Sequence, residues 1–372
     1  MSSANNEKLV WAVIGGGNGG QSAAGHLGIL GFTVRIYDII PETVKAIQEA
    51  GGIYVNGSVE GFGPVDLATG NIRDAVHGAD IVMVIAPSLA HAAIAKELSP
   101  HLEDGQLVFI HPGSTLGALE FRKIFDEENI QVDVTVCEAI SLVYACRSDK
   151  PGHASIKGIK NNVMVAAIPA NRTKEAVSKL NSAFPQFIAG NNVLETSLNN
   201  LNAVMHPTPT VLNTSMIESK HDWKYYWDGI TPSIGRFTQE LDQERVNIGK
   251  AFGVKLDPVL QMYKTLYNSE GKTLAEAILN TDAYREIAGQ KKMETRYLLE
   301  DIPMGLVPMI SLAKVVGVNT DRMETIAKLG GYLLDRDFFS AGRTLEKLGL
   351  DGMNAEGIIE YLTTGVKSPQ SR

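Results

Sequence analysis

The chain has 372 residues, of which 44% are hydrophobic and 20% charged, and this composition is typical of a globular protein large enough for two domains. Its formal net charge of −8 argues against nucleic acid as a main partner, because phosphate binding requires a basic face. The apolar run at residues 9–14 is too short to cross a membrane and is stopped by glycines, so we expect no membrane partner.

The two cysteines, Cys137 and Cys146, do not form a CxxC pair, and no cluster of histidine and cysteine has the spacing of zinc ligands. This pattern favours reduced thiols in a cytoplasmic protein that holds no metal.

Short apolar runs alternate with helical patterns along the first half of the chain. Continuous β-branched runs are typical of strands covered on both faces, as in a parallel sheet. The predicted strands are 9–14, 34–38, 81–85, 107–110, 132–137, 142–145 and 163–168, and the predicted helices are 21–30, 43–50, 90–98 and 118–127. This alternation predicts a Rossmann-type α/β fold with a doubly wound parallel sheet.

The pattern changes near residue 190, and the second half is mostly amphipathic helix. Helical periodicity is present at 193–205, 234–252, 258–266, 274–279, 306–316 and 321–334. We therefore predict an α/β domain over residues 1–190, followed by an all-α domain over residues 191–372.

A glycine-rich segment with the GxGxxG pattern directly follows the first predicted strand and opens the first helix. In this setting Gly15 permits a tight turn, Gly17 lets the backbone approach a pyrophosphate, and Gly20 lets the helix pack closely on the strand. The helix N-terminus offers free N–H groups to the phosphates. A turn that binds nothing is the alternative, but the context favours a dinucleotide. The predicted contacts are Gly15, Gly17, Asn18, Gly19 and Gly20.

The second predicted strand ends in Asp38, whose carboxylate can accept hydrogen bonds from the adenosine ribose and would repel a 2′-phosphate. Arg35 could attract that phosphate, but side chains alternate along a strand, so Arg35 and Asp38 point to opposite faces. No basic residue follows Asp38, where Ile39 and Ile40 stand. The segment therefore favours NAD over NADP and assigns the N-terminal domain to dinucleotide binding.

Two further loops follow strands of the predicted sheet, at the edge where ligands bind in open α/β sheets. Ala86 and Pro87 are predicted to contact the coenzyme there. His111 lies in the other loop, and we expect it to cap the strand or turn and to have no catalytic role.

Hydride transfer needs a proton donor or acceptor beside the substrate, and a cation for any carboxylate. His206 precedes Pro207, which disfavours helix in the residue before it, so a helix should kink or end at His206. The ring would then be free to enter a cleft, with Asn202 one turn earlier on the same face. Alternatively, His206 only satisfies backbone groups that the kink frees, and the residues alone leave both possibilities open.

Asp301 lies near Pro303 at a predicted helix end, where its carboxylate could hold a histidine in one tautomer. Arg296 could bind a substrate carboxylate through two parallel hydrogen bonds. A surface ion pair between Arg296 and Glu300, four residues apart, is an equally good interpretation of the sequence.

Along nearly its whole length the chain resembles the opine dehydrogenases, and it is most similar to the bacterial N-(1-carboxyethyl)-norvaline dehydrogenase type. The similarity is carried by several short motifs. They are the segments at 15–20, 117–124, 146–148, 202–207, 229–233, 295–297, 300–301 and 342–350.

The resemblance implies an NADH-dependent reductive condensation of an L-amino acid with a 2-oxo acid such as pyruvate. The family's catalytic histidine falls on His206 and its paired aspartate on Asp301. Its carboxylate-binding arginine falls on Arg296, and Cys146 and Ser141 fall near the substrate carboxylates, where Cys146 would line the site without acting as a nucleophile. Asn202 is an expected substrate contact.

Two other functions stay open at this point. One is a dehydrogenase of the same two-domain plan, of the ketopantoate or glycerol-3-phosphate type, which usually relies on a lysine in the helical domain. The other is a protein that senses the coenzyme without catalysis. We further expect a homodimer whose substrates are small molecules, with an apolar amino acid as the amine.

Overall fold

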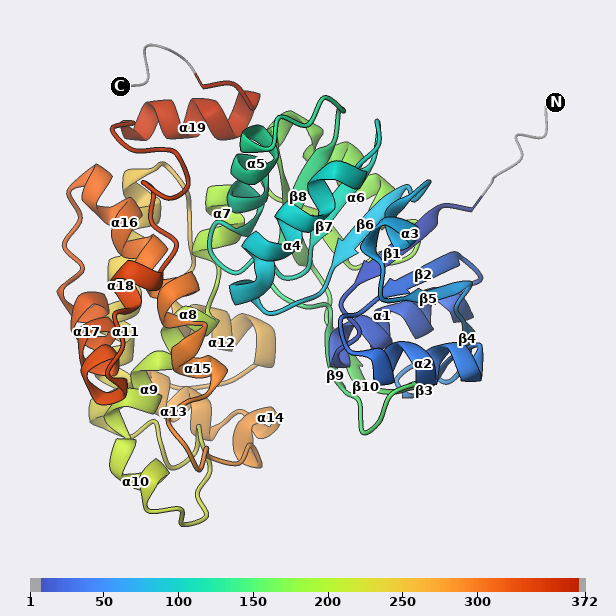
Figure 1. The fold of residues 1–372 in the computed structure, drawn as a ribbon. Coiled ribbons are helices and arrows are strands. Elements are labelled where there is room, and N and C mark those ends of the chain that lie inside the picture. The colour runs from blue at the N-terminus through green and yellow to red at the C-terminus, as the bar shows by residue number, and fades with distance from the viewer. Residues whose placement is uncertain (1–7, 368–372) are drawn as a thin grey trace. The chain divides into compact units, whose positions relative to one another are not determined.

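The computed structural model describes residues 8–367, which form two compact units (Figure 1). The first unit extends to Thr196 and also contains Leu362–Val366, whereas the second comprises Ser197–Tyr361 together with Lys367. The division thus falls a few residues beyond the boundary predicted after Gly190. Each unit is described by itself below.

The main sheet of the first unit confirms the predicted Rossmann-type architecture. Within residues 8–367 it has eight strands in the order β12-β11-β8-β7-β6-β1-β2-β5. Neighbouring strands are parallel except for β8 and β11, which are antiparallel. The strands are β1 (Val10–Ile14), β2 (Thr33–Tyr37), β5 (Leu67–Thr69), β6 (Ile81–Val84), β7 (Leu107–Ile110), β8 (Thr135–Ala139), β11 (Val163–Ile168) and β12 (Phe187–Ala189).

A second, four-stranded sheet in the same unit was not expected. Its order is β4-β3-β10-β9, formed by β4 (Gly61–Pro64), β3 (Gly52–Gly57), β10 (His153–Ile159) and β9 (Tyr144–Arg147). The strand predicted at 142–145 corresponds to β9 and so belongs to this sheet, not to the main one. Of the other three strands, β3 and β4 each contain two glycines, and polar residues interrupt β10, so none has the continuous apolar run that marks the main sheet.

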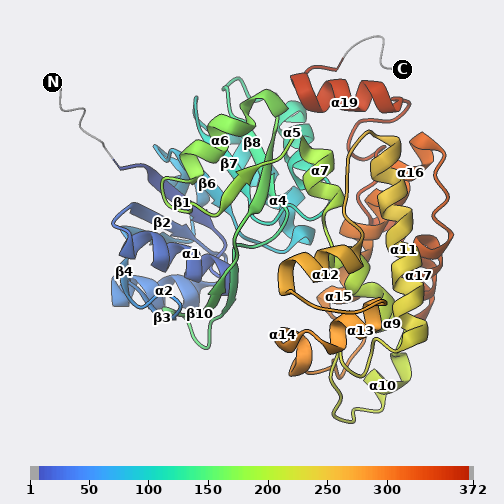
Figure 2. The same cartoon turned by 180° about the vertical axis from the view of Figure 1, so that it is seen from behind.

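Helices cover both faces of the main sheet. Figure 1 shows α4 in front of β6 and β7, whereas Figure 2 brings α1 and α6 to the front. Helix α1 contacts β1 and β2 on one side and all four strands of the second sheet on the other. The helices of this part are α1 (Asn18–Ile29), α2 (Pro41–Ala50), α3 (Ile72–Val76), α4 (His91–Leu98), α5 (Gly117–Glu127), α6 (Thr173–Leu180) and α7 (Val193–Leu198), with short 3₁₀ turns at Ser88–Ala90, Ser99–His101 and Ala170–Arg172.

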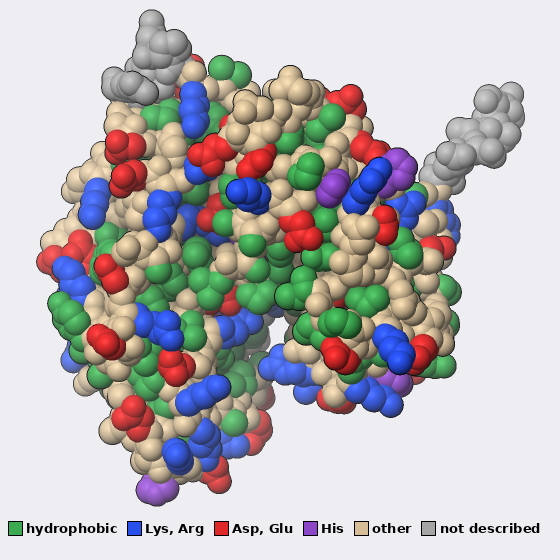
Figure 3. Space-filling view, viewed as in Figure 1, with side chains coloured by type: hydrophobic (Ala, Val, Ile, Leu, Met, Phe, Trp, Pro, Cys, Tyr) green, Lys and Arg blue, Asp and Glu red, His purple; other side chains and the backbone are tan. Residues whose placement is uncertain are grey.

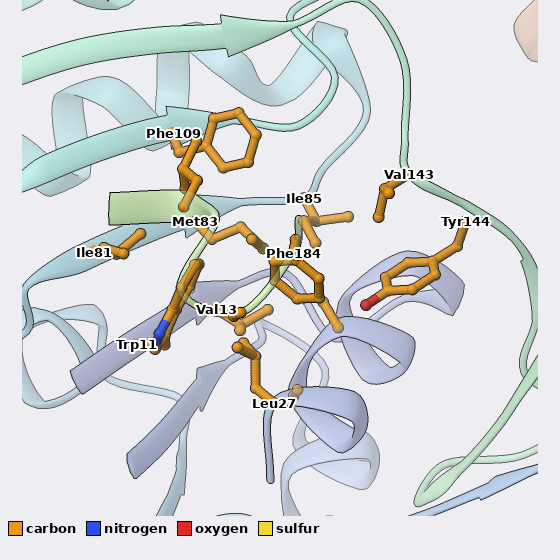
Figure 4. Close-up of a cluster of buried hydrophobic side chains, with 14 of the residues drawn as sticks. Trp11, Val13, Leu27, Ile81, Met83, Ile85, Phe109, Val143, Tyr144 and Phe184 are labelled. Carbon is orange, nitrogen blue, oxygen red and sulfur yellow. The ribbon is translucent and has the colours of Figure 1, made fainter. Parts of the chain in front are cut away.

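The core of the first unit forms where the inner strands meet α1 and the segment after α6. Trp11, Met83 and Phe109 of three neighbouring strands lie against Leu27 of α1 and against Phe184 (Figure 4). The rings of Trp11 and Phe184 meet edge to face, with centroids 5.7 Å apart. Burial of each large apolar side chain contributes about 1.5–3 kcal/mol, so this cluster stabilises the packing of α1 on the sheet.

The second unit is helical, as predicted. The long helix predicted at 193–205 is interrupted at Asn199 and Asn200, which favour turns, and becomes α7 and α8. The helices are α8 (Asn202–Met205), α9 (Pro207–Leu212), α10 (Thr214–Glu218), α11 (Pro232–Ala251), α12 (Val259–Tyr267), α13 (Leu274–Leu279), α14 (Asp282–Arg285), α15 (Arg296–Leu299), a π-helical turn at Ile302–Leu306, α16 (Val307–Val316), α17 (Asp321–Leu334) and α18 (Phe338–Ala341); α19 (Ala355–Thr364) follows.

A buried ion pair anchors α11 to its neighbours. The Arg245 guanidinium donates to the Asp242 carboxylate at 2.7 Å and to the carbonyl oxygens of Leu198 and Asp257. The other oxygen of Asp242 accepts from the backbone N–H of Val259. Because every charged atom of this pair has a partner, the pair joins the end of α7 and the start of α12 to α11.

The surface carries charges of both signs. On the face shown in Figure 3, basic and acidic side chains are interspersed over each unit.

No helix within residues 8–367 has both the length and the apolar character needed to cross a bilayer.

Candidate functional site

The glycine loop between β1 and α1 has the backbone geometry that its sequence predicts. Gly15 has a φ of +112°, and a Cβ atom added there would lie 2.3 Å from the carbonyl oxygen of Ile85. A Cβ atom added at Gly20 would lie 1.7 Å from the carbonyl oxygen of Gly15. Neither position has room for a side chain, so these two glycines set the turn and the close approach of α1 to β1.

Gly17 differs from its neighbours because the space around it is open. A Cβ atom added there would meet nothing within 4 Å. Gly17 is also the N-cap of α1, no side chain caps the helix, and no acidic residue occupies its first turn. The first N–H groups of α1 therefore suit a pyrophosphate, and the loop fits the dinucleotide expected from the sequence. Gly19 packs beside Ile85 at the same helix end.

Asp38 is fixed beside this loop at the end of β2. One carboxylate oxygen accepts the backbone N–H of Gly16, and the other accepts the N–H of Ile40 at 2.7 Å. Arg35 is held elsewhere, since its guanidinium donates to the carbonyl of His77. The one basic side chain considered for a 2′-phosphate is thus tied to the backbone after α3.

Ala86 and Pro87 follow β6, and Ala86 lies next to the glycine loop. The backbone N–H of Ile85 donates to the carbonyl of Ile14 at 2.9 Å, which extends the pairing of β6 with β1 to the residue before Ala86. The Ala86 nitrogen lies 3.8 Å from the Cβ position of Gly15. Ala86 is half-buried and Pro87 is exposed.

His111 has the capping geometry that we expected. Its Nε2 atom accepts the backbone N–H of Val143 at 2.9 Å, and its ring stacks on Phe109. Burial, assisted by the nearby Lys160 cation, lowers the pKa of His111 to about 3. A neutral, buried ring that holds a backbone N–H has a structural role and is poorly suited to proton transfer.

Two residues at the start of α1, Asn18 and Gln21, join the glycine loop to the segment that follows β9. Only Asn18 was predicted from the sequence. The Asn18 side-chain oxygen accepts the backbone N–H of Ser148 at 3.1 Å. Gln21, which was not predicted, donates to the Gly16 carbonyl at 2.7 Å and accepts from the Gly152 N–H at 2.8 Å. A buried glutamine among small residues one turn into α1 was the available signal for this role.

Cys146 and Ser141 also belong to the first unit. Cys146 is buried on β9, where it pairs with Ile156 of β10. Ser141 precedes β9 and is half-buried. Both lie in the first unit, whereas the predicted catalytic residues lie in the second.

His206 sits at the predicted kink in the second unit. It ends α8 and begins α9, and its backbone N–H donates to the Asn202 carbonyl at 3.0 Å. Pro207 and Pro209 have no N–H, so the carbonyls of residues 203 and 205 lose their helical partners. The Tyr225 hydroxyl lies 3.4 Å from the Met205 carbonyl oxygen, but it donates its proton to the nearer His206 carbonyl at 2.7 Å. The His206 side chain is not used to satisfy the freed carbonyls. Asn202 itself is exposed at the start of α8.

The structure brings Asp301 to His206. The Nδ1 atom of His206 lies 2.7 Å from a carboxylate oxygen of Asp301, and both side chains are buried. Because a carboxylate only accepts, Nδ1 is the donor. Nε2 makes no hydrogen bond within residues 8–367 and is available to a substrate atom.

Arg296 begins α15, the helix that ends just before Asp301. Its side chain is 62% exposed, and its Nε atom lies 3.8 Å from the Glu300 carboxylate. The backbone N–H of Asp301 donates to the Arg296 carbonyl at 3.1 Å, so these two residues are held in one turn. The guanidinium has a loose partner and is open to solvent, which leaves it able to take a second carboxylate.

Tyr297 was not singled out from the sequence. Its ring lies parallel to the His206 ring, with centroids 3.8 Å apart and an interplanar angle of 6°. The sequence did not mark Tyr297 as a site residue, because an aromatic residue in a predicted helix is most often part of the hydrophobic core. Residues 8–367 contain no cluster of three or more side chains that could ligate a metal ion.

Comparisons with known proteins identify both halves of the chain. Residues 11–128 match the NAD binding domain of 6-phosphogluconate dehydrogenase, and residues 189–334 match the α-helical domain of NAD/NADP octopine/nopaline dehydrogenase. An opine dehydrogenase from Arthrobacter sp. (strain 1C) is 42% identical over 95% of this chain and 98% of its own length. Vitopine synthase from Allorhizobium ampelinum is 26% identical over 78% of this chain and 80% of its own length.

The fold agrees with these relatives. A solved structure of octopine dehydrogenase with NADH and L-arginine superposes with a TM-score of 0.82, covering 98% of this chain and all of that chain at 20% identity. The identity over nearly the full length sets aside both alternatives, the ketopantoate or glycerol-3-phosphate type and the non-catalytic sensor. The chain belongs to the opine dehydrogenase family and is an NAD-dependent oxidoreductase that acts on CH–NH donors.

Proposed function

We propose that the enzyme condenses an L-amino acid with a 2-oxo acid such as pyruvate and reduces the resulting imine to a secondary amine that carries two carboxylates. The amine and the ketone lose one water as the imine forms, and bound NADH supplies the hydride that reduces it. The observation that carries this proposal is the buried His206–Asp301 pair, whose Nε2 atom remains available.

In this proposal His206 moves the proton. When Nε2 is protonated it can donate to the oxygen derived from the ketone as water leaves, or to the reacting nitrogen. Asp301 keeps Nδ1 as the donor and stabilises the imidazolium. The burial of both side chains strengthens this interaction, because little water competes for it.

Arg296 is proposed to bind a substrate carboxylate. Its exposed, planar guanidinium suits two parallel hydrogen bonds to a carboxylate, and the Glu300 carboxylate lies no nearer than 3.8 Å from its Nε atom. Cys146, Ser141 and Asn202 are proposed as further substrate contacts on the strength of the family resemblance. Cys146 would line the site, since hydride transfer forms no bond to sulfur.

The coenzyme contacts are proposed at the glycine loop and its neighbours. Gly15, Gly17, Asn18, Gly19 and Gly20 would hold the pyrophosphate at the start of α1. Ala86 and Pro87 would contact the coenzyme beyond β6. Each oxygen of Asp38 already accepts one backbone N–H but retains a second lone pair, with which it can accept a ribose hydroxyl.

The amine is proposed to have an apolar side chain, such as norvaline, leucine, methionine or phenylalanine. The aromatic segment 223–227 follows α10, and Tyr225 of this segment packs edge to face on Tyr297 beside His206. Asp222, which could pair with a basic amine, is already held by Lys291 at 2.5 Å, and this hydrogen bond lowers the pKa of the Asp222 carboxyl. The buried rings of Trp223, Tyr225 and Tyr226 also support the alternative of simple core packing.

One assay tests the reaction. NADH absorbance is followed with pyruvate alone, with an amino acid alone, and with both, and the product is identified by mass. We expect NADH loss only with both reactants and a product mass equal to the two substrates minus one oxygen, because the water that leaves takes two hydrogens and the reduction restores two. Loss with pyruvate alone would indicate a simple 2-oxo acid reductase instead.

We further propose that the enzyme is a homodimer and that it is located in the cytoplasm, which is a reducing compartment. The dimer is supported by exposed apolar side chains on α17, namely Leu329, Tyr332 and Leu333, which offer a surface for subunit contact. The reducing compartment is supported by the two cysteines, which are free and buried. Light scattering during gel filtration tests the dimer, which would be contradicted by the mass of one chain.

A further inference from the structure

One hydrogen bond cannot by itself fix the orientation of the His206 imidazole. The contact with Asp301 holds the Nδ1 atom, but a single hydrogen bond tolerates small coupled turns about the Cα–Cβ and Cβ–Cγ bonds that tilt the ring. Such a turn would move Nε2, the atom that faces the substrate in the proposed reaction. A second contact is needed to set the plane of the ring.

Tyr297 supplies that contact. The two rings are stacked almost parallel, at 6°, with a centroid separation of 3.8 Å, which is full face-to-face contact. Any tilt of the imidazole out of this parallel plane toward Tyr297 would drive one edge of the ring into the tyrosine. The stack therefore restricts the motion that the hydrogen bond leaves open.

Tyr225 contacts both partners of this stack, the ring of Tyr297 and the backbone of His206. It is fully buried, and its ring meets Tyr297 edge to face at 5.0 Å. Its hydroxyl donates to the His206 carbonyl at 2.7 Å and, since that proton is used, accepts from the Thr210 hydroxyl at 2.9 Å. Tyr225 thus contacts both the backbone of His206 and the ring that stacks on its side chain.

We infer that Tyr297 and Tyr225 are positioning residues that aim the Nε2 atom of His206. Tyr297 sets the plane of the imidazole, and Tyr225 fixes the backbone at the proline kink. This inference rests on the proposed role of His206 as the proton donor. It also gives segment 296–301 a third function, because the same short stretch holds Arg296, Tyr297 and Asp301.

The test compares two substitutions at Tyr297. Tyr297→Leu removes the aromatic face, and because small misplacements of a catalytic group cost up to about 100-fold, we expect kcat to fall by about 10–100-fold. The KM values for NADH and pyruvate should change little, since neither substrate loses a contact. The solvent deuterium isotope effect on kcat should rise as proton transfer becomes limiting. Tyr297→Phe keeps the face and should retain most of kcat.

A matched control separates positioning from packing. Tyr263→Leu also removes a buried tyrosine of the second unit, but its ring contacts Tyr267 and Tyr284 and not His206. We expect it to lower thermal stability without lowering kcat or raising the isotope effect. An equal loss of kcat in this variant would contradict a specific role for Tyr297.

Tyr225→Phe provides a second route if Tyr297→Leu does not fold. It keeps the buried ring and removes only the hydroxyl that holds the His206 carbonyl, so kcat should fall several-fold with KM unchanged. Wild-type kcat in Tyr225→Phe and in any folded Tyr297→Leu would overturn the inference. His206→Ala, measured in parallel, distinguishes a failure of the proposed function from a failure of the positioning role. Normal turnover in His206→Ala would refute the proposed function, whereas its loss beside a normal Tyr297→Leu would refute the positioning role alone.

Discussion

The Nδ1 atom of His206 and the carboxylate of Asp301 lie 2.7 Å apart although 95 residues separate them in the chain. The contact depends on two proline-containing segments. Pro207 ends α8 at His206, and Asp301 stands between the short helix α15 and the π-helical turn that contains Pro303. Since each partner sits at a helix end, their side chains meet without distorting a long helix.

Asp301→Asn tests the electrostatic part of this contact. The amide is nearly the same size but carries no charge and cannot stabilise an imidazolium, so kcat should fall by about 10²-fold, within the range for disabled acid–base catalysis. Steady-state rates with saturating NADH measure the effect. Asp282→Asn, at an exposed position on α14, is the control and should leave kcat unchanged. An unaffected rate in Asp301→Asn would remove Asp301 from the proton relay.

Asp38→Ala tests the coenzyme site. Loss of the carboxylate leaves the N–H groups of Gly16 and Ile40 without their acceptor and removes the group that repels a 2′-phosphate. The ratio of kcat/KM for NADH over NADPH should fall by at least about tenfold, equivalent to one charge-assisted hydrogen bond. Asp74→Ala, exposed on α3, should leave the ratio as it is. A wild-type enzyme that prefers NADPH would show that Asp38 does not select the coenzyme.

Arg296→Lys tests carboxylate binding. The lysine keeps the charge but loses the planar fork, and because a charge-assisted hydrogen bond contributes about 1.5–3 kcal/mol, KM for one substrate should rise by about tenfold or more. Glu300→Gln removes the loose partner at 3.8 Å and should affect KM far less. If KM for both substrates stays constant in Arg296→Lys, the arginine is only a surface partner of Glu300.

Arg245→Ala tests the buried ion pair of α11. Breaking one side leaves the Asp242 charge buried without compensation, which typically costs about 3–5 kcal/mol. Both side chains are almost fully buried, so solvent cannot replace the partner. The urea midpoint should fall markedly, whereas Lys328→Ala, which breaks an exposed pair with Glu324, should shift it little. Similar shifts in the two variants would contradict an anchoring role.

The neutral state of His111 predicts a dependence of stability on pH. Burial lowers its pKa from the ordinary 6.5 to about 3, so between these values the unfolded chain binds a proton that the folded chain does not. Stability from this group is complete above pH 6.5 and is lost as pH falls toward 3. Thermal melts across this window should show a smaller slope in His111→Gln. An unchanged slope would mean that other groups control acid unfolding.

The sequence predicts the coenzyme half of the site better than the catalytic half. The positions of the glycine loop, Asp38 and Ala86 depend on local backbone geometry, so their spacing contains the signal. The contact of His206 with Asp301 joins distant segments, and only the family resemblance pointed to it. The stack of Tyr297 on His206 has no periodic or motif signal.

The fold was predicted where apolar runs were continuous. The inner strands of the main sheet are buried on both faces and were found, whereas β3 and β4 are short, glycine-rich and half exposed and were missed. The break between α7 and α8 at Asn199 and Asn200 was also missed, because hydrophobic periodicity continues across it. Turn preference outweighed that periodicity in the structure.

The most direct test of the account measures His206→Ala with NADH, pyruvate and methionine. Loss of a general acid–base group typically costs about 10²–10⁴-fold, so kcat should collapse by that factor. NADH binding, followed by its fluorescence, should stay near the wild-type affinity, because the glycine loop belongs to the other unit. A variant that binds NADH and turns over at nearly the wild-type rate would contradict the central claim that His206 carries the proton.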